Sequence, residues 1–270
     1  SQVGERVLRD GGNAVDAAVA VAFALAVTYP TAGNIGGGGF LVYRPFEGEP
    51  AAYDFREMAP ATAFPTMFMR GDEYDRVLHH NGHLAVGVPG TVAGLHLAWF
   101  EYGSLPWERL VAPAIRLARD GFVVSQALAS SLAGVLPRMA DYPASVAQFS
   151  NGGVPYRVGE ILRQGDLAST LSRIAAQGPL GFYAGETAEL MAREMAAHGG
   201  IMTKGDLAGY SAVRRAPLVG TYRGVDVISM PPASSGGATV IQMLNILEGY
   251  DLKGLDPRSS AYTHLLIEAL

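Results

Sequence analysis

Residues 53–60 read Tyr53-Asp54-Phe55-Arg56-Glu57-Met58-Ala59-Pro60, and this stretch places a charged cluster at the end of an apolar segment. A second apolar segment, residues 40–43, precedes it, and two prolines lie in the intervening residues 45–50. Short apolar segments on either side of a turn are typical of paired strands. We therefore expect a β-hairpin of residues 40–43 and 51–55, with Arg56 at the end of its second strand.

Arg56 is flanked by two acidic residues, Asp54 and Glu57. A guanidinium that is held still at the end of a strand can bind a carboxylate through two parallel hydrogen bonds, which an ammonium cannot do. The same arrangement suits a structural ion pair between Arg56 and one of its acidic neighbours. The local sequence therefore leaves two interpretations open, a binding site for an anionic ligand and a structural bridge.

The composition is that of a globular chain with a large core. Of its 270 residues, 49% are hydrophobic and 17% are charged, which argues against disorder. The net charge is −5 and no block rich in Lys or Arg occurs, so we expect no nucleic-acid partner. There is no cysteine, which excludes disulfides, thiolate nucleophiles and cysteine-ligated metals within this sequence.

The longest apolar stretch, residues 14–29, contains Asp16 and ends at Pro30. It is short for a membrane span, so we expect a buried helix with Asn13 as its N-cap, and no membrane span. Further helices are expected over residues 1–9, 91–102, 106–119, 125–136, 166–176, 185–197, 238–247 and 259–270, and a strand over residues 225–230. This pattern predicts an α+β fold in one continuous domain, residues 1–270.

Residues 64–83 and 137–165 are expected to be irregular, because they are polar or rich in loop-forming residues. The helical patterns at both ends of the chain are interrupted, so both ends look cut. Missing targeting signals therefore indicate nothing about the whole protein.

Familiar catalytic and nucleotide-binding signatures are missing from the sequence. It contains neither a G-x-S-x-G nor a G-x-x-x-x-G-K-[ST] motif. The four glycines at residues 36–39 lack the following lysine of a phosphate loop, so we interpret them as support for close backbone packing. Ser234 and Ser235 precede a predicted helix, which favours a capping role over a nucleophilic one.

The histidines also give no clear metal site. His79, His80 and His83 lie close together in a polar segment where no helix face is expected to present them, so we favour a surface loop. His96, His198 and His264 are interpreted as packing or surface residues. The sequence therefore predicts no metal and no cofactor.

Eight blocks of sequence, taken together, resemble one known family. They are residues 11–18 (GGNAVDAA), 36–40 (GGGGF), 54–60 (DFREMAP), 87–94 (GVPGTVAG), 102–107 (YGSLPW), 113–115 (PAI), 222–224 (YRG) and 231–237 (PPASSGG). In this order, over nearly the whole chain, they resemble the large subunit of the γ-glutamyltransferases. One departure is Pro-Pro-Ala before Ser234, where Pro-Pro-Pro is more usual.

The resemblance implies an N-terminal-nucleophile hydrolase, an αββα sandwich of which this chain would form the large-subunit part. It also implies a zymogen that cuts itself into two subunits, so that a Thr at the new N-terminus of the small subunit becomes the nucleophile. That Thr would attack a γ-glutamyl amide such as glutathione, and the resulting ester would pass its γ-glutamyl group to water or to an acceptor amine. The sequence ends before the expected cleavage site, so no catalytic residue is expected in this chain.

In the family resembled, the arginine of the Asp-Phe-Arg-Glu motif binds the α-carboxylate of the glutamyl group. The matching residue is Arg56, which makes it the predicted substrate-binding residue of this chain. The predicted partners are the small catalytic subunit and a small γ-glutamyl substrate. By the same resemblance, the enzyme is expected in the periplasm or outside the cell.

Two alternatives remain open at this stage. The first keeps the fold and changes the substrate, as in glutaryl (cephalosporin) acylases or poly-γ-glutamate transpeptidases, because Arg56 suits any substrate with a carboxylate at the right depth. The second is a carboxylate-binding remnant without catalysis, whose other half has been lost.

Overall fold

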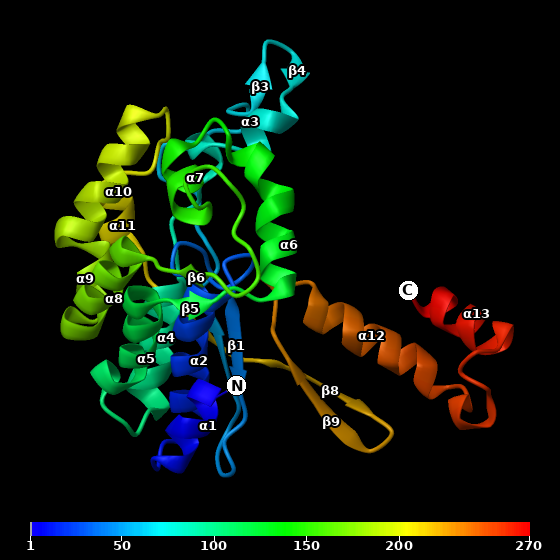
Figure 1. Cartoon of the computed structure of the whole chain (residues 1–270). Helices are drawn as coiled ribbons and strands as arrows, with labels where there is room; N and C mark the ends of the chain where they lie inside the picture. The colour runs from blue at the N-terminus through cyan, green and yellow to red at the C-terminus, as the bar shows by residue number, and fades with distance from the viewer. Residues whose placement is uncertain (1) are drawn as a thin grey trace. The chain divides into compact units, whose positions relative to one another are not determined.

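The computed structural model describes residues 2–270 and shows a chain of helices with several short antiparallel sheets (Figure 1). Its contacts divide the chain into two compact units. Unit 1 comprises Ser1–Gly38 and Glu57–Ser211, and unit 2 comprises Gly39–Arg56 and Ala212–Leu270. The expected single continuous domain stays a prediction.

Unit 1 is predominantly helical. Its helices are α1 (Gln2–Arg9), α2 (Ala14–Thr28), α3 (Arg76–His80), α4 (Thr91–Tyr102), α5 (Trp107–Asp120), α6 (Gln126–Val135), α7 (Pro143–Phe149), α8 (Gly165–Gln177), α9 (Leu180–Tyr183), α10 (Gly185–Ala197) and α11 (Lys204–Gly209). Two short helical turns are η1 (His83–Ala85) and η2 (Leu136–Met139). Its strands form two antiparallel pairs, β3 (Met69–Arg70) with β4 (Glu73–Tyr74), and β5 (Phe122–Val123) with β6 (Ile161–Leu162).

Helix α2 forms the centre of unit 1 and begins where the sequence predicts. The Asn13 side chain accepts hydrogen bonds from the backbone amides of Val15 and Asp16, and the Asp16 carboxylate accepts one from the Asn13 amide. This capping box satisfies donors that the first helical turn would otherwise leave unpaired. The small residues that follow allow the helix to pack closely, and Phe23 and Val27 are fully buried.

Helix α5 packs against α2, and α8 packs against α5, which completes the core of unit 1. The rings of Phe23 and Trp107 meet edge to face with centroids 5.5 Å apart, which is a favourable aromatic geometry. The indole nitrogen of Trp107 donates to the carbonyl of Ile174, 2.9 Å away, and Gln164 Nε2 donates to the carbonyl of Val27 at 2.7 Å. The buried polar groups are thus paired, as a close-packed core requires.

Unit 2 contains the predicted hairpin. Strands β1 (Phe40–Tyr43) and β2 (Ala51–Asp54) pair antiparallel with Phe40 opposite Asp54, and β7 (Val213–Arg215) pairs with the other edge of β2. A separate antiparallel pair is formed by β8 (Leu218–Tyr222) and β9 (Val225–Ser229). The remaining elements are α12 (Gly236–Glu248), η3 (Leu252–Gly254) and α13 (Ser260–Ala269).

The α+β prediction is confirmed, and so are the hairpin and the main predicted helices. Two expectations are wrong in part. Residues 64–83 contain the β3–β4 pair and helix α3, and residues 137–165 contain α7 and β6. Both segments have polar sequences without a clear period, but short elements can form there because the surrounding fold supplies their contacts. Strands β7 and β8 and helices α9 and α11 were not expected.

Candidate functional site

Arg56 lies directly beyond strand β2, where the chain leaves a buried sheet and becomes exposed. All four residues of β2 are buried, and Tyr53 is fully so. Phe55 is also buried, and its backbone exchanges two hydrogen bonds with Gly39. A Cβ on Gly39 would come within 2.9 Å of the Phe55 ring, so the glycine permits this close pairing. The backbone that leads to Arg56 is therefore held in place by the burial of β2 and by the pairing of Phe55 with Gly39.

Asp54 helps to hold this strand end through a partner far along the sequence. Its Oδ2 accepts a hydrogen bond from Nε of Arg215 at 2.8 Å, and its Oδ1 accepts one from the Arg56 backbone amide at 3.2 Å. Arg215 lies in β7, beside β2 in the sheet. Asp54 thus forms an ion pair with Arg215 that ties two strands together. Nothing in the local sequence pointed to Arg215 as the partner of Asp54.

The guanidinium of Arg56 contacts a second segment of unit 2. Its Nη1 donates to the carbonyl of Ala233, 2.9 Å away, in the turn that precedes α12. That turn is tight, because a Cβ on Gly237 would lie 2.1 Å from the carbonyl oxygen of Met230. Ser234 Oγ accepts from the Gly236 amide at 3.2 Å, whereas Ser235 makes no side-chain capping bond. The N-cap Ser235 thus lacks the expected capping bond, Ser234 braces the turn before it, and the same turn supplies the acceptor for Arg56.

Part of the glycine-rich loop packs backbone against backbone in unit 1. The carbonyl of Gly37 accepts hydrogen bonds from the amides of Gly90 and Thr91 at 2.7 and 3.0 Å. Asn34 Oδ1 accepts from the Gly37 amide at 3.0 Å, and a Cβ on Gly37 would lie within 3 Å of the Asn34 side chain. A phosphate at a helix N-terminus needs such amides for itself. The contacts agree with packing as the role of these glycines.

Asp16 links two other sequence blocks of unit 1. Its fully buried carboxylate accepts a hydrogen bond from the Ser104 hydroxyl at 2.5 Å, and others from the backbone amides of Ser104 and Leu105. Burial alone would raise the pKa of this carboxyl, but the bonds from Ser104, Asn13 and Leu105 outweigh it and lower the pKa. Asp16 is therefore ionised and structural.

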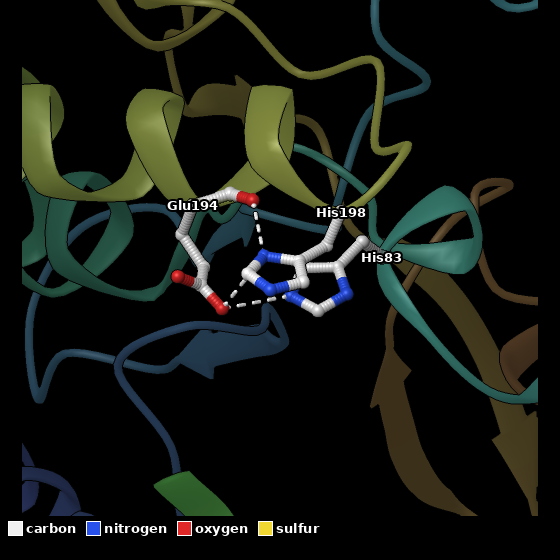
Figure 2. A group of neighbouring side chains, drawn as sticks. All are labelled: His83, Glu194 and His198. Carbon is white, nitrogen blue, oxygen red and sulfur yellow. Dashed lines mark hydrogen bonds and ion pairs between the residues drawn. The ribbon is translucent and has the colours of Figure 1, made fainter. Parts of the chain in front are cut away.

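The histidines differ from expectation in one respect. His79 and His80 belong to helix α3, so the expectation that no helix presents them is wrong. His83, in contrast, meets Glu194 and His198 from α10 and its end, and their potential ligand atoms lie within 4.8 Å of one another (Figure 2). In residues 2–270 this is the group that could hold a metal ion. His83 and Glu194 are 111 positions apart, and only the spacing of Glu194 and His198 offers a local signal.

The helices of residues 2–270 include none with both the length and the apolar character that a membrane crossing requires. This agrees with the interpretation of residues 14–29 as a buried helix.

Comparisons with known proteins match the whole chain. A family model described as Gamma-glutamyltranspeptidase matches residues 1–270. The glutathione hydrolase proenzyme of Escherichia coli (strain K12) is 50% identical over 275 residues, covering 100% of this chain and 47% of the relative. The acylase ACY 1 proenzyme of Pseudomonas sp. (strain SE83) is 40% identical, covering 100% of this chain and 50% of the relative. The chain thus spans about half the length of the curated relatives it matches.

A solved structure agrees with the same assignment. The crystal structure of Helicobacter pylori γ-glutamyltranspeptidase superimposes with a TM-score of 0.98 at 46% identity, covering 100% of this chain and 78% of that one. The predicted fold class, that of an N-terminal-nucleophile hydrolase, is therefore confirmed. On the family model, the identities and the superposition together, the chain belongs to the γ-glutamyltranspeptidase family.

Proposed function

We propose that the chain is the large-subunit portion of an enzyme that cleaves γ-glutamyl amides such as glutathione and transfers the γ-glutamyl group to water or to an amino acid or peptide acceptor. The observation that carries this proposal is the position of Arg56, an exposed arginine at the end of a buried strand. The relative named glutathione hydrolase proenzyme, 50% identical over this chain, supports the substrate class.

Arg56 is the residue we assign to the substrate carboxylate. A guanidinium has five N–H donors in a planar fork, and the bond from Nη1 to Ala233 gives that plane a defined direction. Asp54 has its own charged partner in Arg215, so the sheet does not depend on Arg56 to neutralise that acid. A substrate carboxylate would then receive charge-assisted hydrogen bonds from a group positioned in advance.

The catalytic part of the enzyme is assigned to a partner. We infer a precursor that cuts itself, with the nucleophilic Thr at the start of a small subunit and its own α-amino group acting as base. Unit 2 offers support for such a partner, because Val219 and Val225 of its β8–β9 pair and Ile267 of α13 are well exposed. Exposed apolar groups of this kind mark surfaces that other chains cover. We place the enzyme in the periplasm or outside the cell.

The test of this function is the substitution Arg56→Lys in the complete, matured enzyme. An ammonium keeps the charge but cannot form the two parallel bonds of the fork, so we expect KM for γ-glutamyl-p-nitroanilide to rise about 10- to 100-fold. The matched control is Arg44→Lys, because Arg44 is exposed in the same hairpin and donates to the Gly48 carbonyl in its turn. An Arg56→Ala enzyme with unchanged kinetics would exclude Arg56 from substrate binding.

An acylase is the second candidate, favoured by the 40% identity to the acylase ACY 1 proenzyme. A glutaryl group has the same chain length as a glutamyl group and lacks the α-amino group, so Arg56 could bind its carboxylate too. Side-by-side assays with γ-glutamyl and glutaryl anilides separate the two, and we expect turnover of the γ-glutamyl compound to dominate. A remnant without catalysis would turn over neither compound and would lack a Thr-Thr or Thr-Ser pair downstream of this chain.

A further inference from the structure

His83, Glu194 and His198 form a compact cluster of metal-ligating side chains in unit 1 (Figure 2), and no role assigned above uses them. His83 Nε2 lies 3.1 Å from Glu194 Oε1, and His198 Nδ1 lies 3.2 Å from the same oxygen. The two imidazole rings are stacked, with centroids 4.7 Å apart and an angle of 19° between their planes. Both rings therefore present a nitrogen towards one carboxylate oxygen.

These separations suit a first-row transition ion. Zinc binds histidine nitrogens and carboxylate oxygens at about 2.0–2.2 Å in tetrahedral geometry, which places neighbouring ligand atoms about 3.3 Å apart. Two edges of the cluster are already 3.1 and 3.2 Å long. Two imidazoles and one carboxylate are also a ligand set that zinc uses in open sites, with water in the fourth position.

The surroundings allow a cation to bind. Glu194 and His198 are one helical turn apart at the C-terminal end of the 13-residue helix α10, where the helix dipole favours positive charge. Their side chains are 55% and 54% exposed, whereas that of His83 is 19% exposed, so the cluster is open on the α10 side. Arg138 lines the adjoining groove of about 440 Å³, but it is exposed, and solvent screens its charge.

Both imidazoles have to change when an ion enters, because His83 Nε2 and His198 Nδ1 each donate a hydrogen bond to a Glu194 oxygen. His198 Nδ1 also lies 3.1 Å from the backbone carbonyl of Glu194, so as drawn it carries a proton. The exposed ring can release that bond and offer a nitrogen lone pair instead, because the carbonyl can be satisfied by water. His83 makes its contact through Nε2, the ring nitrogen farther from the backbone.

We propose that His83, Glu194 and His198 bind a divalent transition ion of the zinc type. The ion links η1, which contains His83, to the C-terminal end of α10 across 111 residues of sequence. Binding to the folded form alone raises thermal stability in proportion to the logarithm of the ion concentration. The site takes no part in the chemistry proposed for Arg56. The bound ion cross-links η1 and α10 within unit 1.

The experiment is a titration of the complete, matured and tag-free enzyme with Zn²⁺ after treatment with a chelator, at about pH 7.5. We expect saturable binding of one ion and a rise in Tm. Glu194→Gln and His198→Gln are expected to weaken binding about 10- to 100-fold and to abolish the Tm rise. Both residues are more than half exposed, so these variants keep the fold.

The matched control is Glu189→Gln, since Glu189 lies on the same helix and pairs with Lys204 outside the cluster. Its zinc affinity should equal that of the unmodified enzyme. Mg²⁺ in excess should not displace zinc, because it prefers all-oxygen ligands. The proposal is overturned if no saturable zinc binding occurs, or if Glu194→Gln and His198→Gln bind zinc as tightly as the control.

Discussion

Helix α2 of unit 1 and helices α12 and α13 of unit 2 all contain many apolar residues, but the three helices differ greatly in how many residues they bury. Eight of the 15 residues of α2 are buried, against two of 13 in α12 and one of 10 in α13. In α2 the apolar residues meet α1, α4 and α5, whereas Ile267 in α13 is 60% exposed. Exposed apolar side chains on a helix mark a surface that another protein chain can bury.

The two sheets of unit 2 also differ in how deeply their strands are buried. Strand β2 lies between two neighbours and is buried throughout. Among residues 2–270, β8 and β9 pair only with each other, and Val225 is 65% exposed. A lone two-stranded pair is marginally stable in water, so β8–β9 depends on what packs against it. In this unit α12 contacts β8 (Figure 1). We therefore expect the stability of unit 2 to rise most when the proposed small subunit binds.

The largest expected effect is in the core of unit 1. Phe23→Ala removes a fully buried ring that packs on Trp107, and we expect a loss of about 3–5 kcal/mol in the free energy of unfolding. Leu25→Ala on the same helix is the control, because Leu25 is 42% exposed, and its loss should stay within about 0.5 kcal/mol. Denaturant unfolding of the complete protein measures both, and equal losses would contradict the burial of α2.

A smaller effect is expected at Asp16. Asp16→Asn turns an acceptor of several N–H and O–H groups into a side chain that is itself partly a donor, so we expect a loss of about 2–3 kcal/mol at neutral pH. The control is Asp10→Asn, since Asp10 is exposed and pairs with Arg109 at the surface, where such pairs contribute about 0–1 kcal/mol.

The pH dependence of this effect follows from the direction of the pKa shift. The pKa of Asp16 is lower in the folded protein than its ordinary value of 3.8, so its contribution is complete above that value and is lost as the pH falls through the folded pKa. The stability difference between the unmodified protein and Asp16→Asn should therefore shrink as the pH drops below about 4. A difference that grows in acid would refute the assignment.

The smallest expected effect on the lone chain is at Ile267. Ile267→Ala should change the stability of residues 1–270 by no more than about 0.5 kcal/mol, because the side chain is 60% exposed. If the small subunit covers this surface, the same substitution should cost more in the assembled enzyme, about 1–3 kcal/mol for a newly buried side chain. Thermal unfolding of both forms tests this, and equal losses would show that α13 stays uncovered.

The sequence is most informative where a local signal fixes an element. Asn13 caps α2 as expected, because an N-cap requires only the side chain and the next few amides. Ser125 and Ser259 cap α6 and α13 at the positions where helices were expected to begin. The hairpin turn at Arg223 and Gly224, both with positive φ, closes β8–β9 but was not expected, although Tyr222-Arg223-Gly224 had been noted as a block. Strand β7, with two arginines in three residues, has no strand pattern and depends on pairing with β2.

The candidate site also depends on contacts between distant residues, which the sequence alone does not predict. Arg56 could be selected from its motif and its place after a strand, and its role in substrate binding stays a prediction. Its contact with Ala233, 177 residues away, and the pairing of Asp54 with Arg215, 161 residues away, are products of the fold. The His83, Glu194 and His198 cluster is a similar case, because two histidines with separate surroundings in the sequence meet only in space.

The most direct test of the account is the activity of the two halves apart and together. Residues 1–270 are produced alone, confirmed by mass spectrometry to contain no part of the small subunit, and assayed with γ-glutamyl-p-nitroanilide before and after addition of the separately produced small subunit. We predict no turnover by the lone chain and turnover after reconstitution, because the nucleophile is supplied by the partner. Turnover by residues 1–270 alone would contradict the proposed division of the enzyme.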